Sequence, residues 1–345
     1  MTLHKRRFHP AGCKRQRGLS LIELMIGMLI GLLLIAGMIS IFSANKQTYR
    51  YNEELARLQE NSRFAIEFIQ RSLRMAGHIG CPELNAPATA LKRASLVPAL
   101  DLRTLTSVTA YQYSPTNTGV LGTMGMTAKT GTDVVTVTYG SGASATLDTV
   151  VQAGADSLVI KNNALGFKQG EVALISNCEQ AELFSISNTP ASGTSVTLEH
   201  KASGGNTPAA TTWAWAEDAR VMRLNQQIFF IGPSTGRVTN RQGNTFNSLY
   251  VGTNEMVEGV EDMVVTYGVP ATAGGREVSQ YVQVGSVANW ADVLAVKVEL
   301  LMASVDDNAI NETQTITFNG VATAMADHRM YSTAATTISL RGNVD

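Results

Sequence analysis

Histidine and cysteine are scarce in this chain of 345 residues, which has five histidines and three cysteines. His4 and His9 lie near the N-terminus, and the other histidines are far apart in the sequence. No Cys-x-x-Cys or clustered His/Cys pattern occurs, so a zinc site or a histidine-based nucleophile has no support. Phosphate-binding glycine loops are also missing, because Gly140–Gly142 lacks the rest of any such motif. We therefore expect no metal, no cofactor and no enzymatic activity.

Charge is sparse and unevenly distributed. Charged residues make up 16% of the chain and apolar residues 44%, and the length suffices for one large or two ordinary domains. Residues 1–18 hold six basic residues and no acidic one. Without this segment the 27 basic residues fall to 21 against 28 acidic ones, a net charge of −7. A body of that sign repels nucleic acid phosphates, so we expect no nucleic acid partner.

The cysteines indicate an oxidising compartment. Cys13 lies in the basic leader, so a product cleaved after the leader keeps the even pair Cys81 and Cys178. A disulfide between them would close a loop of about 100 residues, worth roughly 4–5 kcal/mol in the chain-entropy model. The alternative is two unrelated buried thiols.

A long apolar run follows the basic leader. Leu24–Phe42 is a stretch of 19 residues without a charge. As a helix rising about 1.5 Å per residue it covers nearly the ~30 Å hydrocarbon core of a bilayer. The basic leader would stay in the cytoplasm and place the chain after Phe42 outside. A plain signal anchor would explain the run equally well.

Glu23 distinguishes the two interpretations. A carboxylate in the middle of a bilayer costs roughly 2.5–3.5 kcal/mol, and less near its edge, and a passive anchor needs none. Cleavage between Gly18 and Leu19 would create a positively charged amino terminus four residues before Glu23. Between staggered helices, Glu23 of one subunit could pair with the new terminus of its neighbour and fix their register. The helix dipole also favours an acid in the first turn.

Arg17–Ile26 (RGLSLIELMI) resembles the class III signal of type IV prepilins and type II secretion pseudopilins. The resemblance implies that a prepilin peptidase cuts after Gly18 and N-methylates Leu19, and that Glu23 is the fifth residue of the mature chain. Leu19 stands where the family usually has phenylalanine. The implied segments are a cleaved leader over 1–18 and a helix over 19–77, of which 19–42 is transmembrane.

The helix is expected to continue beyond the membrane. No proline occurs between Pro10 and Pro82 and no glycine between Gly37 and Gly77. Apolar and small residues recur there at steps of three and four, as on the buried face of an amphipathic helix. Gly77 suits the position after the helix C-terminus. Within the span, Gly27 and Gly31 form a Gly-x-x-x-Gly pair that favours close helix packing, although glycine is frequent in membrane helices anyway.

The remainder is expected to be β-rich. Asp133–Tyr139 alternates apolar and polar residues, as a half-buried strand does. Similar runs recur between clusters of Gly, Asn, Ser, Thr and Pro, without the helix–strand alternation of parallel sheets. We expect an α+β fold with the long helix packed on an antiparallel domain over 78–345. Ala202–Pro208 is the candidate seam, and the pattern leaves open whether the domain is single or divided.

Four further segments resemble PilW-type minor pilins: Ala76–Cys81, Ser176–Phe184, Glu255–Val269 and Ala335–Asn343. The resemblance implies a low-abundance subunit that starts fibre assembly with other minor pilins and ends at the pilus tip. Implied partners are the prepilin peptidase, other minor pilins, the major pilin, the inner-membrane assembly platform and a tip adhesin. The implied outputs are twitching motility and attachment, and before assembly the protein would sit in the inner membrane with a periplasmic domain.

Two alternatives stay open. A minor pseudopilin of type II secretion would share the anchor chemistry, and a signal-anchored periplasmic enzyme or binding module would never lose its leader. The sequence explains two other acidic clusters without a functional site. Glu258, Glu261 and Asp262 are interpreted as a surface loop entering a strand, and Asp306–Asn308 as a solvated turn without the ligand spacing of a calcium loop.

Overall fold

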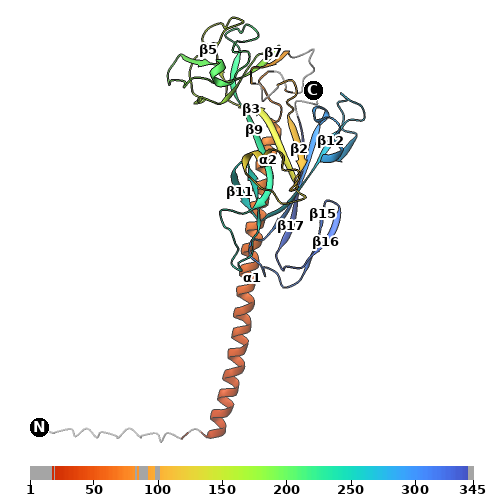
Figure 1. Cartoon of the computed structure of the whole chain (residues 1–345). Coiled ribbons are helices and arrows are strands. Elements are labelled where there is room, and N and C mark those ends of the chain that lie inside the picture. Colours follow the sequence, from red (N-terminus) through yellow and green to blue (C-terminus); the bar gives the residue numbers. More distant parts are fainter. Residues whose placement is uncertain (1–17, 19, 82–83, 85–91, 98–101, 341–345) are drawn as a thin grey trace, which may run out of the picture. The chain divides into compact units, whose positions relative to one another are not determined.

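The computed structural model describes residues 18, 20–81, 84, 92–97 and 102–340. Leu19 and residues 1–17 of the leader, which include Cys13, lie outside these residues. A long helix comes first and strands dominate the chain after it (Figure 1). The helices are α1 (Leu21–Met75) and α2 (Gly119–Met124), with short 3₁₀ turns η1 (Ala202–Gly204), η2 (Val284–Ser286) and η3 (Trp290–Asp292). The strands are β1 (Lys92–Ser95), β2 (Val108–Gln112), β3 (Asp133–Gly140), β4 (Ala145–Thr146), β5 (Ser157–Ile160), β6 (Val172–Ser176), β7 (Gln180–Ser185), β8 (Val196–Glu199), β9 (Arg220–Pro233), β10 (Asn247–Val251), β11 (Asn254–Glu258), β12 (Val260–Val269), β13 (Gln280–Gln283), β14 (Ala295–Ala303), β15 (Gln314–Phe318), β16 (Val321–Met325) and β17 (Tyr331–Ser339).

The chain divides into two compact units, 1–53 and 54–345, with the boundary inside α1. In the first unit, α1 contains a segment long and apolar enough to cross a membrane. Its large apolar side chains are exposed over the whole stretch from Leu21 to Phe42. The apolar run therefore has no core to enter within this unit, and a lipid or a neighbouring helix must cover it.

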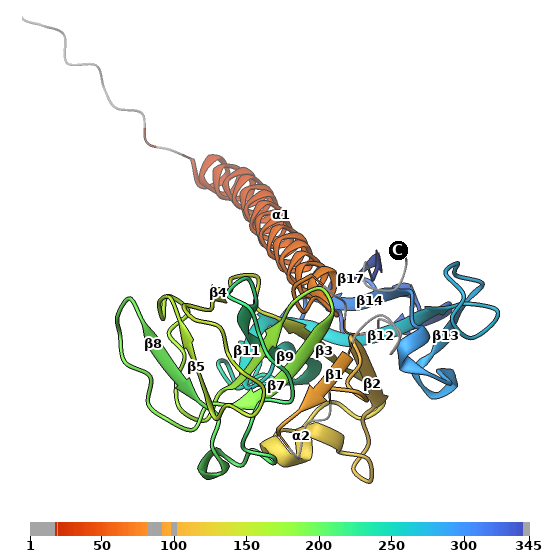
Figure 2. The same ribbon diagram turned by 90° about the horizontal axis from the view of Figure 1, so that it is seen from above.

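In the second unit, the end of α1 is part of a core. Leu58, Ala65, Ile69 and Leu73 are buried at helical spacing. They pack with strand residues from two sheets, including Phe229 of β9. Figure 2 shows β12, β14 and β17 next to this part of the helix. The amphipathic stripe therefore forms the interface that the sequence predicts, and the α+β arrangement is confirmed.

Two large sheets build the second unit. One has nine strands in the order β1-β7-β6-β9-β10-β11, with β2, β3 and β4 attached through β3 and β9. The other is β13-β12-β14-β17, entirely antiparallel. The pair β1–β7 is parallel, which is an exception to the antiparallel expectation among the described strands.

β9 joins two cores. Its second half pairs with β3 and β10 beside the helix, and its first half pairs with β6 and β4 beside a second apolar cluster. That cluster contains Phe184, Leu198, Trp215 and Val221. The candidate seam Ala202–Pro208 lies between β8 and β9, both of which contribute to this second cluster. A subdivision at the seam stays a prediction.

The exit of α1 is tied to β6 and β7. A disulfide joins Cys81 to Cys178, the pair that the even cysteine count favours, across 97 residues of sequence. Beside it, Ser176 Oγ donates to the Ile79 carbonyl at 2.6 Å. Gly80 has a φ of +105°, and a Cβ there would meet Ser176 Oγ at 2.7 Å, so only glycine fits. Two segments of the pilin resemblance, Ala76–Cys81 and Ser176–Phe184, thus meet in space.

Candidate functional site: the N-terminal helix and its anchor in the β-rich unit

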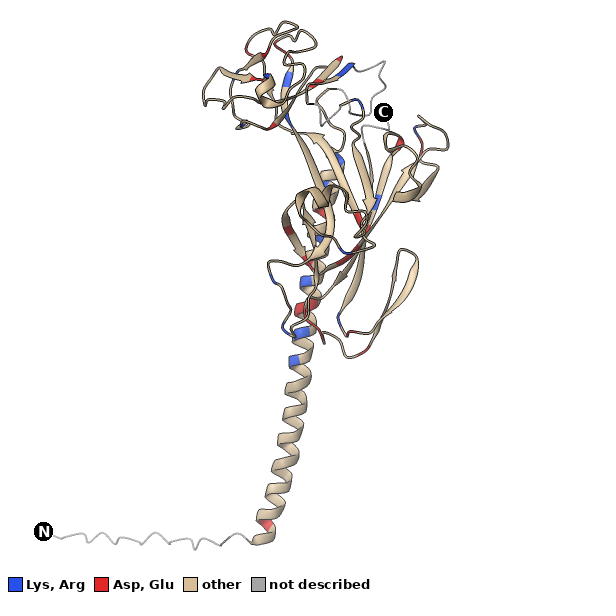
Figure 3. Cartoon of the chain, in the orientation of Figure 1, with Lys and Arg blue, Asp and Glu red and all other residues tan. Residues whose placement is uncertain are grey.

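The first turn of α1 carries an isolated acid. Glu23 is exposed and is the acidic residue of this turn, and the stretch after it is uncharged (Figure 3). Ser20 Oγ accepts from the Glu23 amide at 3.2 Å and so caps the helix N-terminus. None of the residues that the structure describes donates to the Glu23 carboxylate. This carboxylate is therefore available to a cation outside the described chain.

The other predicted residues near Glu23 lie on or beside the same helix. Gly18 is exposed, and Leu19, the residue expected to be methylated, lies outside the described residues. Gly27 and Gly31 lie one turn apart on α1, and a Cβ at either would meet no other atom within 4 Å. Their face is thus open in the single chain, as a helix-packing surface requires. The Ser20-x-x-Glu23 pattern is also the sequence signature of a capping box, which sequence reasoning overlooked.

A buried ion pair lies where strand β12 begins. Arg329 Nη1 is 2.7 Å from Glu261 Oε1, and both side chains are about nine-tenths buried. Arg329 Nε donates to the Ser304 carbonyl at 2.6 Å, and Asn247 Nδ2 donates to Glu261 Oε2 at 2.6 Å. The interpretation of Glu261 as a surface-loop residue is wrong, because the strand pairing β12–β14–β17 brings Arg329 beside it and closes the site to water.

Asp306 corrects a second expectation. Its side chain is buried and forms ion pairs with two guanidinium groups, with Arg237 Nη2 at 2.9 Å and with Arg241 Nε at 3.1 Å. The neighbouring Asp307 accepts from Asn240 Nδ2 at 3.0 Å. The segment is therefore not a solvated turn but the place where the loop after β14 is fastened to the loop after β9.

Two segments of the chain match known protein-family models. Residues 228–342 match the model of Type IV Pilus-assembly protein W, and residues 13–39 match the prokaryotic N-terminal methylation motif. These two matches support a type IV pilin-like protein of the PilW type. No curated protein matches the chain significantly. They support a membrane-anchored subunit related to type IV pilus assembly.

Most of the strand residues in the core that buries the end of α1 lie in the region that matches the PilW model. It starts within β9 and ends after β17, and it supplies Phe229, Val265 and Val298 to the core that buries the helix. It also contains both members of the Glu261–Arg329 pair. The second apolar cluster, around Phe184 and Trp215, lies outside it. The region that matches the PilW model therefore supplies most of the strands of the core in which the end of α1 is buried.

Two carboxylates cap the open edge of β12. β13 pairs only with Thr266–Val269, so the edge amides of Met263 and Val265 have no described strand beside them. Val265 N donates to Asp133 Oδ2 at 2.8 Å, and Met263 N donates to Asp262 Oδ1 at 2.7 Å. Burial raises the pKa of Asp133 to about 6; the hydrogen bond from Val265 lowers it, and the nearby Asp262 carboxylate raises it.

Asp133→Asn is expected to change how stability depends on pH. The folded state of the wild type binds a proton at Asp133 more tightly than the unfolded state, whose pKa is about 4. This contribution is fully present below pH 4 and is lost as pH rises through about 6. Relative to the wild type, the variant should thus gain roughly 2–3 kcal/mol between pH 4 and 7. Denaturant unfolding of the full chain in detergent, followed by tryptophan fluorescence, measures this difference.

The exposed Asp218→Asn is the matched control, and its difference from the wild type should not vary over the same pH range. An Asp133→Asn difference that is constant between pH 4 and 7 would contradict the assignment of this carboxylate as the titrating group.

Glu255 of β11 organises the turn that follows β9. Its carboxylate accepts from Ser234 Oγ at 2.6 Å, from Gly236 N at 2.7 Å and from Ser248 Oγ at 2.7 Å. Burial works to raise the pKa of Glu255, but these donors outweigh it and hold the pKa at about 2. The group is therefore ionised throughout the physiological range and fastens the loop after β9 to β10 and β11.

Proposed function

We propose that this PilW-type protein is a minor pilin that takes part in starting type IV pilus assembly. The observation that carries the proposal is the exposed, unpaired Glu23 carboxylate at the start of an apolar helix, within a matched methylation motif. A carboxylate at the edge of a membrane is stabilised by a cation, and prepilin cleavage supplies one as a new amino terminus.

The assembly step follows from this chemistry. A prepilin peptidase cuts between Gly18 and Leu19 and methylates the Leu19 amine. Glu23 of one subunit then pairs with the terminal amine of its neighbour, while Gly27 and Gly31 let the apolar helices approach closely. The exposed apolar surface from Leu21 to Phe42 supports this step, since it passes from lipid to the helices of other pilins without meeting water.

The location and partners follow from the same proposal. Before assembly the β-rich unit faces the periplasm, because the basic leader stays on the cytoplasmic side. The assembly platform of the inner membrane, the other minor pilins and the major pilin are its partners. A subunit that primes the fibre ends at its tip, where it can hold an adhesin, and the outputs are twitching motility and attachment.

The N-terminal mass of the mature protein tests the proposal. Mass spectrometry of protein isolated from membranes should find an N-terminus at Leu19 carrying one methyl group. A chain that keeps residues 1–18, or one cut near Ala44 as by an ordinary signal peptidase, would overturn the pilin assignment and favour a signal-anchored periplasmic protein.

A further inference from the structure

The hairpin β15–β16 forms an incomplete second layer over the four-stranded sheet. Its turn residues Asn319 and Gly320 both have positive φ, as in the two-residue turns that close tight hairpins. Ile316, Phe318 and Met325 pack on Leu301 and Tyr331, on the outer face of the sheet. The segment 313–326 contains no charged residue. Two strands alone form a marginal sheet, and a third usually completes such a layer.

β16 leaves one edge open. β15 is the only described strand that pairs with it. Phe318 and Val321 flank the two-residue turn and form its closing hydrogen-bonded pair, so the alternation of an antiparallel ladder directs the backbone groups of Ala322 and Ala324 to the open side. Residues 321–324 are exposed, and Val321 is 61% exposed. An uncharged, exposed strand edge is a template for another strand.

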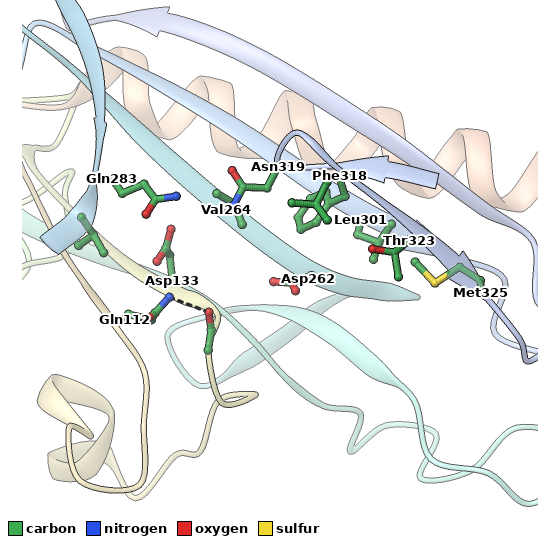
Figure 4. A pocket seen from close by; sticks show the side chains of 13 residues that line it. Gln112, Asp133, Asp262, Val264, Gln283, Leu301, Phe318, Asn319, Thr323 and Met325 are labelled. Carbon is green, nitrogen blue, oxygen red and sulfur yellow. Dashed lines mark hydrogen bonds between the residues drawn. The ribbon is translucent and has the colours of Figure 1, made fainter. Parts of the chain in front are cut away.

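A cavity of about 400 Å³ lies between this hairpin and the sheet below it. Val321, Thr323 and Met325 of β16 line it on the hairpin side, and Asp262 and Val264 of β12 line it on the sheet side. Figure 4 shows Asp133 and Asp262 facing the same cavity as Phe318 and Thr323 of the hairpin. A strand added to β16 would thus lay every second side chain over the carboxylates.

The charged side chains that line this cavity, among the described residues, are all acidic. Among its described lining residues there are two carboxylates, Asp133 and Asp262, and no lysine or arginine. The nearby Lys129 donates its ammonium to the Glu261 carbonyl at 2.8 Å, and its charge reaches Asp262, whose pKa is raised by burial and lowered by Lys129. Side-chain amides add polar groups to the lining, and apolar side chains form walls that can hold the aliphatic part of a lysine or arginine. The lining residues of these two kinds are Gln112, Gln283, Asn319, Val264, Leu301 and Phe318.

We propose that an extended segment of another pilus component adds to β16 as a third strand and places a lysine or arginine between Asp133 and Asp262. Main-chain hydrogen bonds to Ala322 and Ala324 hold the segment, and the cationic side chain selects it. That the segment comes from a pilus component rests on the proposed function, whereas the recognition chemistry does not.

Peptide binding to the purified full chain in detergent tests the inference. The probe is the acetylated and amidated pentapeptide Thr-Val-Arg-Val-Thr, and its control carries citrulline, the neutral isostere of arginine. Isothermal titration calorimetry should show the arginine peptide binding at least about tenfold more tightly, the difference between a charged and a neutral hydrogen-bonded pair. Equal affinities for the two peptides would overturn the proposal.

Variants locate the binding. Asp133→Asn with Asp262→Asn keeps both acceptors for the edge amides and should remove the preference for arginine, whereas Asp218→Asn should keep it. Ala324→Pro removes an amide that points away from β15, so the hairpin can keep its own pairing while losing the added strand. Unchanged binding by Ala324→Pro, with an unchanged circular dichroism spectrum, would refute strand addition.

The strand-addition site and the proposed function can each fail without the other. A methylated Leu19 terminus together with equal peptide affinities would reject the strand-addition site and retain the minor pilin. A retained leader together with arginine-selective binding would retain the site and reject a pilus component as its natural partner.

Discussion

Replacing Glu23 with glutamine is expected to exclude the protein from pili while leaving cleavage after Gly18 intact. Glutamine keeps the size of the side chain and a carbonyl oxygen in the first turn, but it removes the charge that pairs with the terminal amine of the neighbour. The loss of ~1.4 kcal/mol or more in docking lowers incorporation about tenfold or more. Quantitative immunoblotting of sheared pili against membranes measures incorporation, and the N-terminal mass checks cleavage.

Ser20→Ala is the control that separates charge pairing by Glu23 from capping of the helix N-terminus. It removes the Oγ that caps the Glu23 amide, at a cost of about 1 kcal/mol in local helix stability, and leaves the carboxylate in place. We expect this variant to be cut and incorporated. Normal incorporation of Glu23→Gln, combined with failure of Ser20→Ala, would assign the turn to helix capping instead of charge pairing.

Replacing Arg329 with methionine is expected to destabilise the β-rich unit by about 3–5 kcal/mol. The Glu261 carboxylate would then stay buried without the guanidinium that lies 2.7 Å away. The Ser304 carbonyl would also lose its donor, Arg329 Nε. Denaturant unfolding of the full chain in detergent gives the free energy of unfolding of both proteins.

The double variant Glu261→Gln with Arg329→Met should regain part of this loss, because no unpaired charge remains and the Gln amide oxygen can still accept from Asn247. Lys201→Met is the surface comparison. Its partner Glu199 lies 3.1 Å away but both side chains are partly exposed, so the expected cost is below about 1 kcal/mol. A double variant less stable than Arg329→Met alone would contradict the interpretation.

The helix was predictable from the sequence because its signals are local. The uncharged run, the absence of proline, the absence of glycine between Gly37 and Gly77, and the three- and four-residue stripe together indicate one long helix, and α1 spans Leu21–Met75. Gly77 takes a φ of +78° just past its end, as the prediction of a C-terminal glycine requires. The start at Leu21 reflects the Ser20 cap.

Strands with apolar alternation were also predictable, whereas strands poor in large apolar residues, such as β16 and β17, were not. The predicted strand Asp133–Tyr139 corresponds to β3. β16 and β17 consist mainly of alanine, threonine and serine, because neither strand buries a full face of large side chains. Their identity depends on partners far away in the sequence, as in the register of β17 with β14.

The buried charges were beyond sequence reasoning for a related reason. Glu261 and Arg329 meet only after β14 has placed β12 and β17 on its two sides. The acid pair Glu261-Asp262 does carry a signal, since apolar Val260 and Met263 flank it within a strand pattern. Such a pattern indicates that at least one of the acids turns inward and needs a partner, but not which cation provides it.

The disulfide at the helix exit has a mechanical consequence. Residues 82–177 lie between Cys81 and Cys178, and the bond bridges the two ends of this segment. Tension applied between α1 and the strands that follow Cys178 runs through the covalent bridge and bypasses the intervening hundred or so residues. The bypassed strands, β1 to β6, can then yield or rearrange under load without lengthening the connection that carries the pull.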